Sequence, residues 1–369
     1  MLLRKVFFSV ILFSVFVFVS CSSSSSDITG GSNNNNNVAW NIPASEVVSG
    51  GVGKDGIPSL FNPKTISANQ ASFLRDQDLV VGIVVDGQAR AYPHTILDWH
   101  EVVNEDFGND HLLTVSYCPL TGTAIVFKGN NAGRKLTFGV SGLLFNNNLI
   151  MFDRQTNSHW PQMRLQSDEG TLRNAKQIVL NSIETSWGSW KKLFPNTVIL
   201  STDTGFNRPY GRPGSAYPGY NVLNSRPLFP ISFTDSRLPN KQRVHGVIYG
   251  EDADSFTTKV YPIRLSQSTR LIHDVVSANP LLIIDSGENN FVVSYLREVD
   301  GTTLTFDLSG SLPDLPFTFK DNETGSTWNV LGEAIAGPLA GTQLQRPVSY
   351  NAFWFAWGVF FRNAEIYNN

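Results

Sequence analysis

The chain has 369 residues, of which 41% are hydrophobic, 12% aromatic and 16% charged, and its net charge is −3. This length and composition are typical of a globular, β-rich protein with two domains or one large duplicated body. No Lys/Arg-rich stripe is available to neutralise phosphates, so we expect no nucleic-acid partner. The two cysteines are Cys21 and Cys118, and no intrachain disulfide remains if Cys21 is consumed as follows.

Residues 1–21 have the pattern of a bacterial lipoprotein signal. Arg4 and Lys5 precede an apolar stretch, Val6–Val19, which is too short to span a hydrocarbon core of ~30 Å comfortably. Small or β-branched residues then lead directly to Cys21. The pattern predicts lipidation of Cys21 and a lipid-anchored protein of the bacterial cell envelope, facing the periplasm or the cell surface. An ordinary secretory signal with an incidental cysteine is the alternative.

A flexible tether is expected after the signal, over residues 22–40. Ser22–Ser26 and Asn33–Asn37 cannot build a hydrophobic core. A flexible chain of this length spans roughly 20–25 Å. The segment would therefore hold a folded body away from the membrane.

One stretch of the chain occurs twice. Leu136–Trp160 and Leu304–Trp328 align without a gap at an offset of 168, and ten of the 25 pairs are identical. Chance would give roughly one or two identities. The identities indicate a duplicated unit. The pairs include Asp153/Asp321, Ser158/Ser326 and Trp160/Trp328.

The first repeat is expected over residues 41–200. Leu79–Asp86 has the β-branched content of a buried strand, and Asp86-Gly87 is typical of a hairpin turn. Residues 93–104 predict a short helix, and residues 112–117 and 123–127 predict strands around a turn at Cys118. Further strands are expected at 136–140 and 149–152. Ser182–Phe194 predicts a second helix, capped by Ser182.

A bridge segment rich in Pro, Gly and Tyr is expected at residues 201–242, and its length favours packing across both units. The second repeat, 243–369, restarts with a strand at 244–249. His273-Asp274-Val275-Val276 answers His100-Glu101-Val102-Val103. The sequence therefore predicts a mainly β (α+β) fold, with two tandem copies of a β-rich unit, each with short helices, packed about a pseudo-twofold axis.

The cysteine inside the first repeat is the main functional candidate. Cys118 is aligned with Gly287 at an offset of 169, so it is not shared between the copies. It can be an inert buried thiol, a nucleophile activated by His100, or a soft metal ligand. His100 itself is either a core histidine or part of a pocket that it lines together with His273.

Other residues of the first repeat could bind a ligand near this thiol. Arg154 and His159 are aligned with Asn322 and Thr327 in the second copy, so neither is shared between the copies. An arginine beside a thiol can bind an anionic group. His94 is a further candidate. Asp153 and Ser158 are more simply explained as residues that cap backbone groups in a turn.

Several motifs resemble one bacterial family. They are YCPLTGTAIVF, GVSGLLFNNNLIMFDRQTNSHWPQ, LSTDTGFNRPY, DSRLPNKQRVHGV and ETGSTWNVLGEAIAGPLAG followed by FWFAW. Together they resemble the exported family catalogued as domain of unknown function 3179. The resemblance implies no activity. Some members look to carry a second cysteine where this chain has Thr121, which weakens a two-cysteine metal or disulfide role here.

Three functions remain open from the sequence. The first is a membrane-tethered enzyme or ligand-binding protein with a site built from Cys118, His100 and Arg154, with His94 or His159 as further candidates. The second is a non-catalytic interaction module that uses the bridge segment as a docking surface. The third is a copper-type metal-binding protein that uses Cys118 with His100 or His273. No cofactor, substrate or protein partner can be named.

Overall fold

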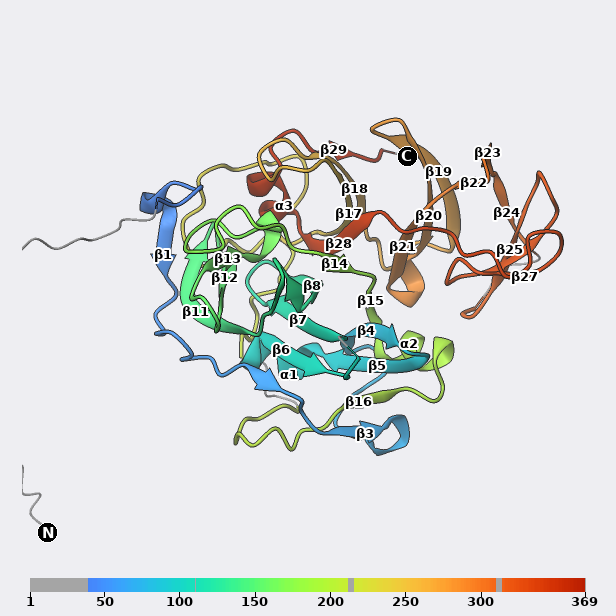
Figure 1. Cartoon of the computed structure of the whole chain (residues 1–369). Helices are drawn as coiled ribbons and strands as arrows, with labels where there is room; N and C mark the ends of the chain where they lie inside the picture. The colour runs from blue at the N-terminus through green and yellow to red at the C-terminus, as the bar shows by residue number, and fades with distance from the viewer. Residues whose placement is uncertain (1–38, 110, 212–215, 310–313, 369) are drawn as a thin grey trace, which may run out of the picture. The chain divides into compact units, whose positions relative to one another are not determined.

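The computed structural model describes residues 39–109, 111–211, 216–309 and 314–368 (Figure 1). It is mainly β, and its three α-helices are α1 (His94–His100), α2 (Trp187–Leu193) and α3 (Trp354–Phe360). Within these ranges no helix is long and apolar enough to cross a membrane. The predicted fold class, mainly β with short helices, is confirmed. Cys21 and nearly all of the expected tether lie outside the described residues.

Three sheets and a hairpin come from the first half of the chain, defined here as residues 41–200. Sheet β15-β4-β5-β16-β3 consists of Ile183–Ser186, Leu79–Val85, Gln88–Pro93, Val198–Leu200 and Thr65–Ser67. Sheet β14-β8-β7-β6-β2 consists of Val179–Leu180, Thr123–Lys128, Leu112–Cys118, Val102–Asp106 and Leu60–Phe61. Sheet β1-β11-β12-β13 consists of Val47–Ser49, Phe138–Phe145, Asn148–Asp153 and His159–Pro161, and the hairpin pairs β9 (Asn130–Asn131) with β10 (Arg134–Lys135).

The second half, defined as residues 243–369, contributes three further sheets and a hairpin. Sheet β28-β17-β18-β29 consists of Val348–Phe353, Arg243–Tyr249, Thr257–Pro262 and Glu365–Ile366. Sheet β19-β20-β21 consists of Arg270–Val276, Asn279–Ser286 and Phe291–Leu296. Sheet β24-β25-β26-β27 consists of Phe306–Leu308, Thr318–Asp321, Thr327–Asn329 and Ala334–Ala336, and the hairpin pairs β22 (Glu298–Val299) with β23 (Thr302–Thr303). Short 3₁₀ helices occur at Ala44–Glu46, Ala68–Gln70, Gln162–Arg164 and Gly287–Asn289.

Two sheets, one from each half, share strand order and strand direction. In each, an antiparallel central pair (β4/β5 or β17/β18) is extended by a parallel strand (β16 or β29). A helix follows the outer strand in both, α2 after β15 and α3 after β28. A glycine of the central strand lies directly under a helix tryptophan, because a Cβ on Gly82 or Gly246 would come within 2.1 or 2.0 Å of Trp190 or Trp357. The ring can pack closely only because the glycine has no side chain.

The shared aspartates organise equivalent turns. Asp153 accepts hydrogen bonds from the backbone N–H of Thr156 (2.6 Å) and from Trp160 Nε1 (3.0 Å). Asp321 accepts from the backbone N–H of Thr324 (2.5 Å) and from Trp328 Nε1 (2.8 Å). Asn157 and Gly325 occupy equivalent positions in the two turns and have φ of 61° and 72°. The geometry agrees with a structural role for Asp153.

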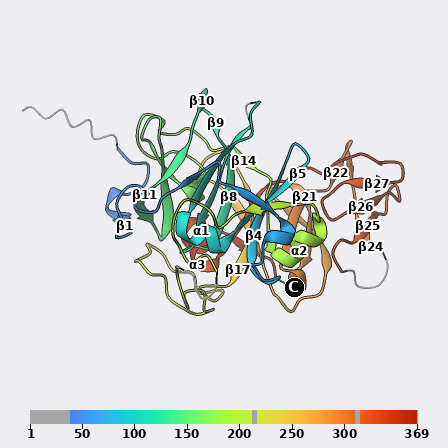
Figure 2. The ribbon, with the colours of Figure 1, turned by 90° about the horizontal axis from the view of Figure 1, so that it is seen from below.

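Both large hydrophobic cores contain residues from both halves. One joins β7, β8, β11 and β12 of the first half to β17, β28 and α3 of the second. The other joins β4, β5, β15 and α2 of the first half to β20, β21 and β24–β26 of the second. Figures 1 and 2 show α2 on the side of the molecule where β21 begins, and β15, the strand before α2, contacts β21 of the second half. The halves are interlocked by this exchange, and the described residues from 39 to 368 belong to one compact unit.

Hydrogen bonds across the two halves follow the same exchange. The backbone N–H of Phe353, just before α3, donates to the carbonyl of Thr121 at 2.8 Å. Reciprocally, Ser189 of α2 donates to the carbonyl of Asn289 at 2.7 Å. Thr121 and Asn289 are 168 residues apart and occupy corresponding positions in two hairpin turns, one from each half. Each turn is therefore sealed by the other half of the chain.

The strand register corrects two correspondences expected from the sequence. Cys118 pairs with Thr123, and Ser286 pairs with Phe291, so the counterpart of Cys118 is Ser286 rather than Gly287. The backbone N–H of Phe306 donates to His273 Nε2, as that of Phe138 donates to Asn104 Oδ1. His273 therefore corresponds to Asn104. The match between His100 and His273 was wrong because three identities in four residues outweighed the strand register.

The predicted helix boundaries also need correction. The helix expected over residues 93–104 ends at His100, and β6 begins at Val102, because two consecutive valines favour a strand. The helix expected from Ser182 begins at Trp187. Its cap is Ser186, whose Oγ accepts from the backbone N–H of Ser189, while residues 183–186 form β15. The turn at Asp86-Gly87 is confirmed, with φ of 49° and 77°.

The bridge segment contacts both halves. Tyr220 donates to the carbonyl of Leu120 at 2.9 Å, and Asn147 donates to the carbonyl of Phe229 at 2.8 Å. From the second half, Trp354 Nε1 donates to the carbonyl of Asp235 at 3.0 Å. These contacts place the bridge over the Cys118 turn.

Candidate functional site

Cys118 lies at the end of β7, in a tight turn closed by Gly122. Its side chain is 1% exposed, and its thiol donates to the carbonyl of Asn147 at 3.4 Å. Gly122 has φ of 60°, and a Cβ there would come within 2.9 Å of the Phe353 ring. Burial, followed by the nearby carboxyl of Glu101, raises the pKa of the thiol to about 11. Cys118 is therefore a protonated thiol at neutral pH.

Glu101 is the residue that sequence reasoning missed. It follows the last residue of α1 and adopts φ of 57° and ψ of −31°, an unusual conformation for a residue with a side chain. Two backbone hydrogen bonds hold it there, from its N–H to the carbonyl of Leu97 and from the N–H of Tyr117 to its carbonyl. Burial, followed by the charge of Asp98, raises the pKa of Glu101 to about 8.

Lys241, at the end of the bridge segment, brings an amine to the same place. The residue is 3% exposed, and its Nζ lies 3.3 Å from the ring centre of Tyr220, with the rings of Phe353 and Phe355 at 4.8 and 4.5 Å. Among the described residues, Nζ has no hydrogen-bond partner. Burial lowers the pKa of Lys241 to about 7, and the charge of Cys118 acts in the opposite direction.

A small cavity of about 80 Å³ is lined by Glu101. Glu101 and Tyr217 contribute its polar groups, and apolar residues form most of the remaining wall. Burial, followed by the charges of Glu101 and Cys118, raises the pKa of Tyr217. A carboxyl and an amine with pKa values near neutrality each interact electrostatically with one thiol, and such shifted values are common at functional sites.

The structure does not pair His100 with Cys118. His100 is fully buried, its Nδ1 is 2.7 Å from the carbonyl oxygen of Pro58, and its Nε2 is 2.5 Å from the hydroxyl of Tyr210. Burial lowers the pKa of its imidazole. Both ring nitrogens are engaged, so His100 fixes the bridge segment to the first half instead of contacting the thiol.

Arg154 and His159 have partners of their own. Arg154 forms two hydrogen bonds with Asp55, at 2.9 and 2.6 Å, and is 39% exposed at its side chain. His159 Nδ1 lies 2.5 Å from Glu169, and its ring lies 5.3 Å from that of Trp40. Arg154 holds the loop around Asp55, and His159 packs against Trp40. The side-chain partners of both residues thus lie away from Cys118.

His94 lies closer to the candidate site. Its ring is 4.3 Å from the ring of Tyr117, the residue before Cys118, and its Nε2 is 3.7 Å from Glu184. Burial, followed by the charge of Arg243, lowers the pKa of His94 to about 3. It is therefore a neutral imidazole packed behind β7.

The expected metal ligands are not gathered in one place. In the part of the chain that the structure describes, no group of three or more His, Cys, Asp and Glu side chains could hold a metal ion. His100 contacts Tyr210, whereas His273 accepts from the backbone of Phe306 in the second half.

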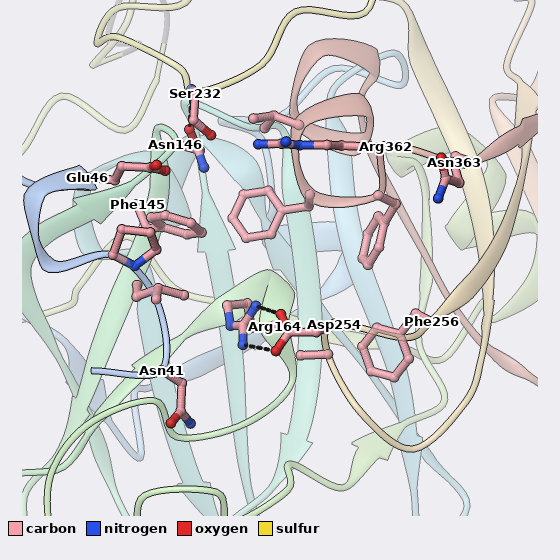
Figure 3. A pocket seen from close by; sticks show the side chains of 17 residues that line it. Asn41, Glu46, Phe145, Asn146, Arg164, Ser232, Asp254, Phe256, Arg362 and Asn363 are labelled. Atoms are coloured by element: carbon pink, nitrogen blue, oxygen red, sulfur yellow. Dashed lines mark hydrogen bonds and ion pairs between the residues drawn. The ribbon is translucent and has the colours of Figure 1, made fainter. Parts of the chain in front are cut away.

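A larger cavity, of about 380 Å³, lies elsewhere (Figure 3). Phe145 and the end of α3 form part of its wall, together with Arg362. Arg164 at its floor donates to Asp254 at 2.8 Å and is also paired with Asp168. Its most buried charge is thus already neutralised, and we place the candidate site at the smaller cavity beside Cys118.

The signal for Glu101 and Lys241 in the sequence is weak. The sequence match aligned Glu101 with Asp274, but the strand register makes Asp274 the counterpart of Glu105. Only the backbone geometry reveals the unusual conformation of Glu101. Lys241 sits in a segment without strands or helices. Its burial depends on Phe353 and Phe355, more than a hundred residues away. No local pattern predicts such contacts.

Fold and site together define a mainly β protein with a buried Cys–Glu–Lys cluster. The chain belongs to the family described as "Protein of unknown function (DUF3179)", which matches residues 54–364. This range includes both halves, the bridge and all three residues of the cluster. The family resemblance of the sequence motifs is confirmed. No curated protein and no solved structure matches the chain.

Proposed function

We propose that the protein is an extracytoplasmic acyl-transfer enzyme with Cys118 as nucleophile, Lys241 as its base and Glu101 as the acid. One observation supports the proposal: a buried carboxyl and a buried amine, both with pKa values near neutrality, interact electrostatically with the same thiol. General acids and bases work best when their pKa lies near the operating pH. The strained backbone of Glu101 is a further feature that is common at active sites.

The three groups permit a balanced reaction. The sulfur of Cys118 attacks the acyl carbon of the substrate, and the thiol proton passes to Nζ of Lys241. The bond from the acyl carbon to the leaving group breaks as Glu101 donates its proton to that group, which leaves a thioester. Water then attacks the thioester, the Glu101 carboxylate takes a proton from that water, and Lys241 returns its proton to the sulfur.

The thiol is expected to lose its proton during the attack and not beforehand. Its pKa of about 11 exceeds that of Lys241, about 7, so forming the ion pair at rest costs roughly 5 kcal/mol, at 1.36 kcal/mol for each factor of ten. A resting thiolate is therefore rare. Lys241 acts as a general base whose help is needed only in the transition state.

A pre-steady-state experiment tests this assignment. The full chain in detergent is mixed with 4-nitrophenyl butyrate, and nitrophenol release is followed on the millisecond-to-second scale. We expect a burst of one equivalent that is absent in C118S and slowed about 100-fold in K241M, the range for loss of a general base. A burst that is lost in H100Q but kept in K241M would assign the base to His100 instead.

A non-catalytic interaction module is the second candidate. The 1% exposure of Cys118 and its raised thiol pKa favour it, because buried, protonated thiols are usually inert. On this view the exposed bridge residues Val222 and Leu228 form a docking surface. It predicts that C118S retains every property of the wild type. A copper-binding role remains the weakest candidate.

We also propose that the chain is a bacterial lipoprotein held at the cell envelope through Cys21. The supporting feature is the sequence of residues 1–21, with Arg4 and Lys5 before an apolar stretch that ends at the cysteine. Globomycin, an inhibitor of lipoprotein signal cleavage, should cause accumulation of the uncleaved chain. A C21A variant that still fractionates with membranes would contradict this proposal.

Finally, we infer that the chain arose by duplication of one β-rich unit. The shared strand order, the two glycine–tryptophan contacts and the equivalent Asp153 and Asp321 turns support this inference. Within such a pair, the copy with Cys118 has the cavity and the amine, whereas Ser286 in the other copy bonds to Thr269 and Asn289. This asymmetry supports a site in the first half alone. His94 would position β7 behind it, and Arg154 and His159 would support the N-terminal segment.

A further inference from the structure

The cavity beside Glu101 has a wall of unusual uniformity. Its one carboxyl belongs to Glu101, and its one hydroxyl belongs to Tyr217. Glycines 50 and 142 and nine larger apolar residues complete the wall. The nine are Val52, Ile57, Leu120, Val140, Leu143, Leu144, Leu149, Leu228 and Phe229. No lysine, arginine or aspartate is among the lining residues, so the wall holds nothing that would pair with a charged ligand.

Two lining residues are also exposed and mark the mouth of the cavity. Leu228 is 60% exposed and Val52 is 37% exposed. Leu149, by contrast, is 1% exposed and lies deep in the wall. The bridge continues this apolar surface outward, since Val222 and Leu223 are 63% and 49% exposed. A ligand entering from solvent would meet apolar side chains from the mouth inward.

We propose that this cavity binds the acyl chain of the substrate, and that the chain is short and uncharged. The inference rests on the proposed acyl transfer at Cys118 and adds its substrate class. A volume of about 80 Å³ is several times the ~10–15 Å³ needed for one water, so it admits a chain of a few carbon atoms. The acyl carbon would then lie beside the carboxyl of Glu101, which lines the cavity.

A charged acyl chain is excluded by the same wall. An acid such as a succinyl group would lose its hydration without gaining a cationic partner, which is costly in an apolar site. A long chain would exceed the enclosed volume and leave its end on the exposed bridge residues. The cavity therefore discriminates by charge first and by length second.

A panel of 4-nitrophenyl esters tests the substrate class with the full chain in detergent. The acyl groups are acetyl, butyryl, octanoyl and succinyl, and C118S supplies the background rate. We expect butyryl to have the highest kcat/KM, at least about 100-fold above succinyl. If the succinyl ester reacts as fast as the butyryl ester, and its turnover is lost in C118S, the substrate class is overturned and the proposed acyl transfer stays intact.

Two tryptophan variants locate the binding site. L228W places a large ring at the mouth and should lower kcat/KM for the butyryl ester about tenfold, with a smaller loss for the acetyl ester. L223W is the matched control, because Leu223 is similarly exposed in the same segment but does not line the cavity. Equal effects of the two variants would overturn the assigned cavity. If wild type hydrolyses every ester no faster than C118S does, the proposed function is overturned, and this inference with it.

Discussion

Replacing Glu101 by glutamine should change how the stability of the protein depends on pH. The substitution keeps the size of the side chain and removes only its ability to ionise. In the folded chain the pKa of Glu101 is raised by burial, and then by Asp98, from 4.5 to about 8. The folded state therefore binds more protons than the unfolded state between pH 4.5 and 8. The contribution of the Glu101 carboxyl to stability is fully present below pH 4.5 and is lost as pH rises to about 8.

The size of this effect follows from the two pKa values. They differ by about 3.5, and each unit corresponds to 1.36 kcal/mol, so the full effect is about 5 kcal/mol, and relaxation of the site would reduce it to roughly 3. Other carboxyls titrate alike in both proteins. The difference in unfolding free energy between wild type and E101Q therefore isolates Glu101.

Urea unfolding of both proteins at pH 4.5, 6, 7 and 8 measures this difference. We expect the wild type to lose about 3–5 kcal/mol relative to E101Q across the series. D98N is the matched variant, because removing the charge of Asp98 should bring the end of the window below pH 8. A difference that stays constant from pH 4.5 to 8 would refute the buried, protonated carboxyl on which the proposed chemistry depends.

Three further predictions concern the amine and the repeated elements. The stability of wild type relative to K241M should rise between pH 7 and 10.5. Burial lowers the pKa of Lys241 in the folded chain, so the unfolded chain binds more protons in this range. If the amine were solvated, urea unfolding at pH 7 to 10 would show a constant difference between the two proteins. D153A and D321A should each cost about 2–4 kcal/mol, since each leaves a buried tryptophan N–H unpaired, and markedly unequal costs would show that the two turns are not equivalent. G246A should lower the free energy of unfolding in urea by about 3 kcal/mol, because its Cβ meets the Trp357 ring, whereas G53A, with open space around it, should change that free energy by no more than about 0.5 kcal/mol.

Much of the fold is predictable because its signals are local. The strand at β4 follows from β-branched residues, its hairpin from Asp86-Gly87, and the paired turns from the identities around Asp153 and Asp321. The exchange of packing between the halves is not predictable in this way. It depends on which core α3 joins. Nearly all residues of α3 are apolar, so its sequence does not distinguish one core from the other. Long-range pairing of this kind is decided by tertiary fit.

The candidate site shows the same division between local and non-local signals. Cys118 stands out in the sequence because the matching stretch of the second half has no cysteine. The strand register shows that its counterpart there is Ser286 and not Gly287. His100 looked like a catalytic base because it is near Cys118 in sequence, yet its ring nitrogens face Pro58 and Tyr210. Lys241 is buried against Tyr220, Phe353 and Phe355 only because the bridge folds back over the first half. A buried amine of this kind is visible in the structure alone.

Trapping the acyl-enzyme tests the central claim most directly. The full chain is mixed with 4-nitrophenyl butyrate, quenched in acid within seconds, and digested for mass spectrometry of the Cys118 peptide. The account predicts a butyryl thioester on Cys118 in the wild type and far less adduct in K241M and E101Q at equal times. A Cys118 peptide that stays unmodified in the folded wild type, and reacts only once the chain is unfolded, would contradict it.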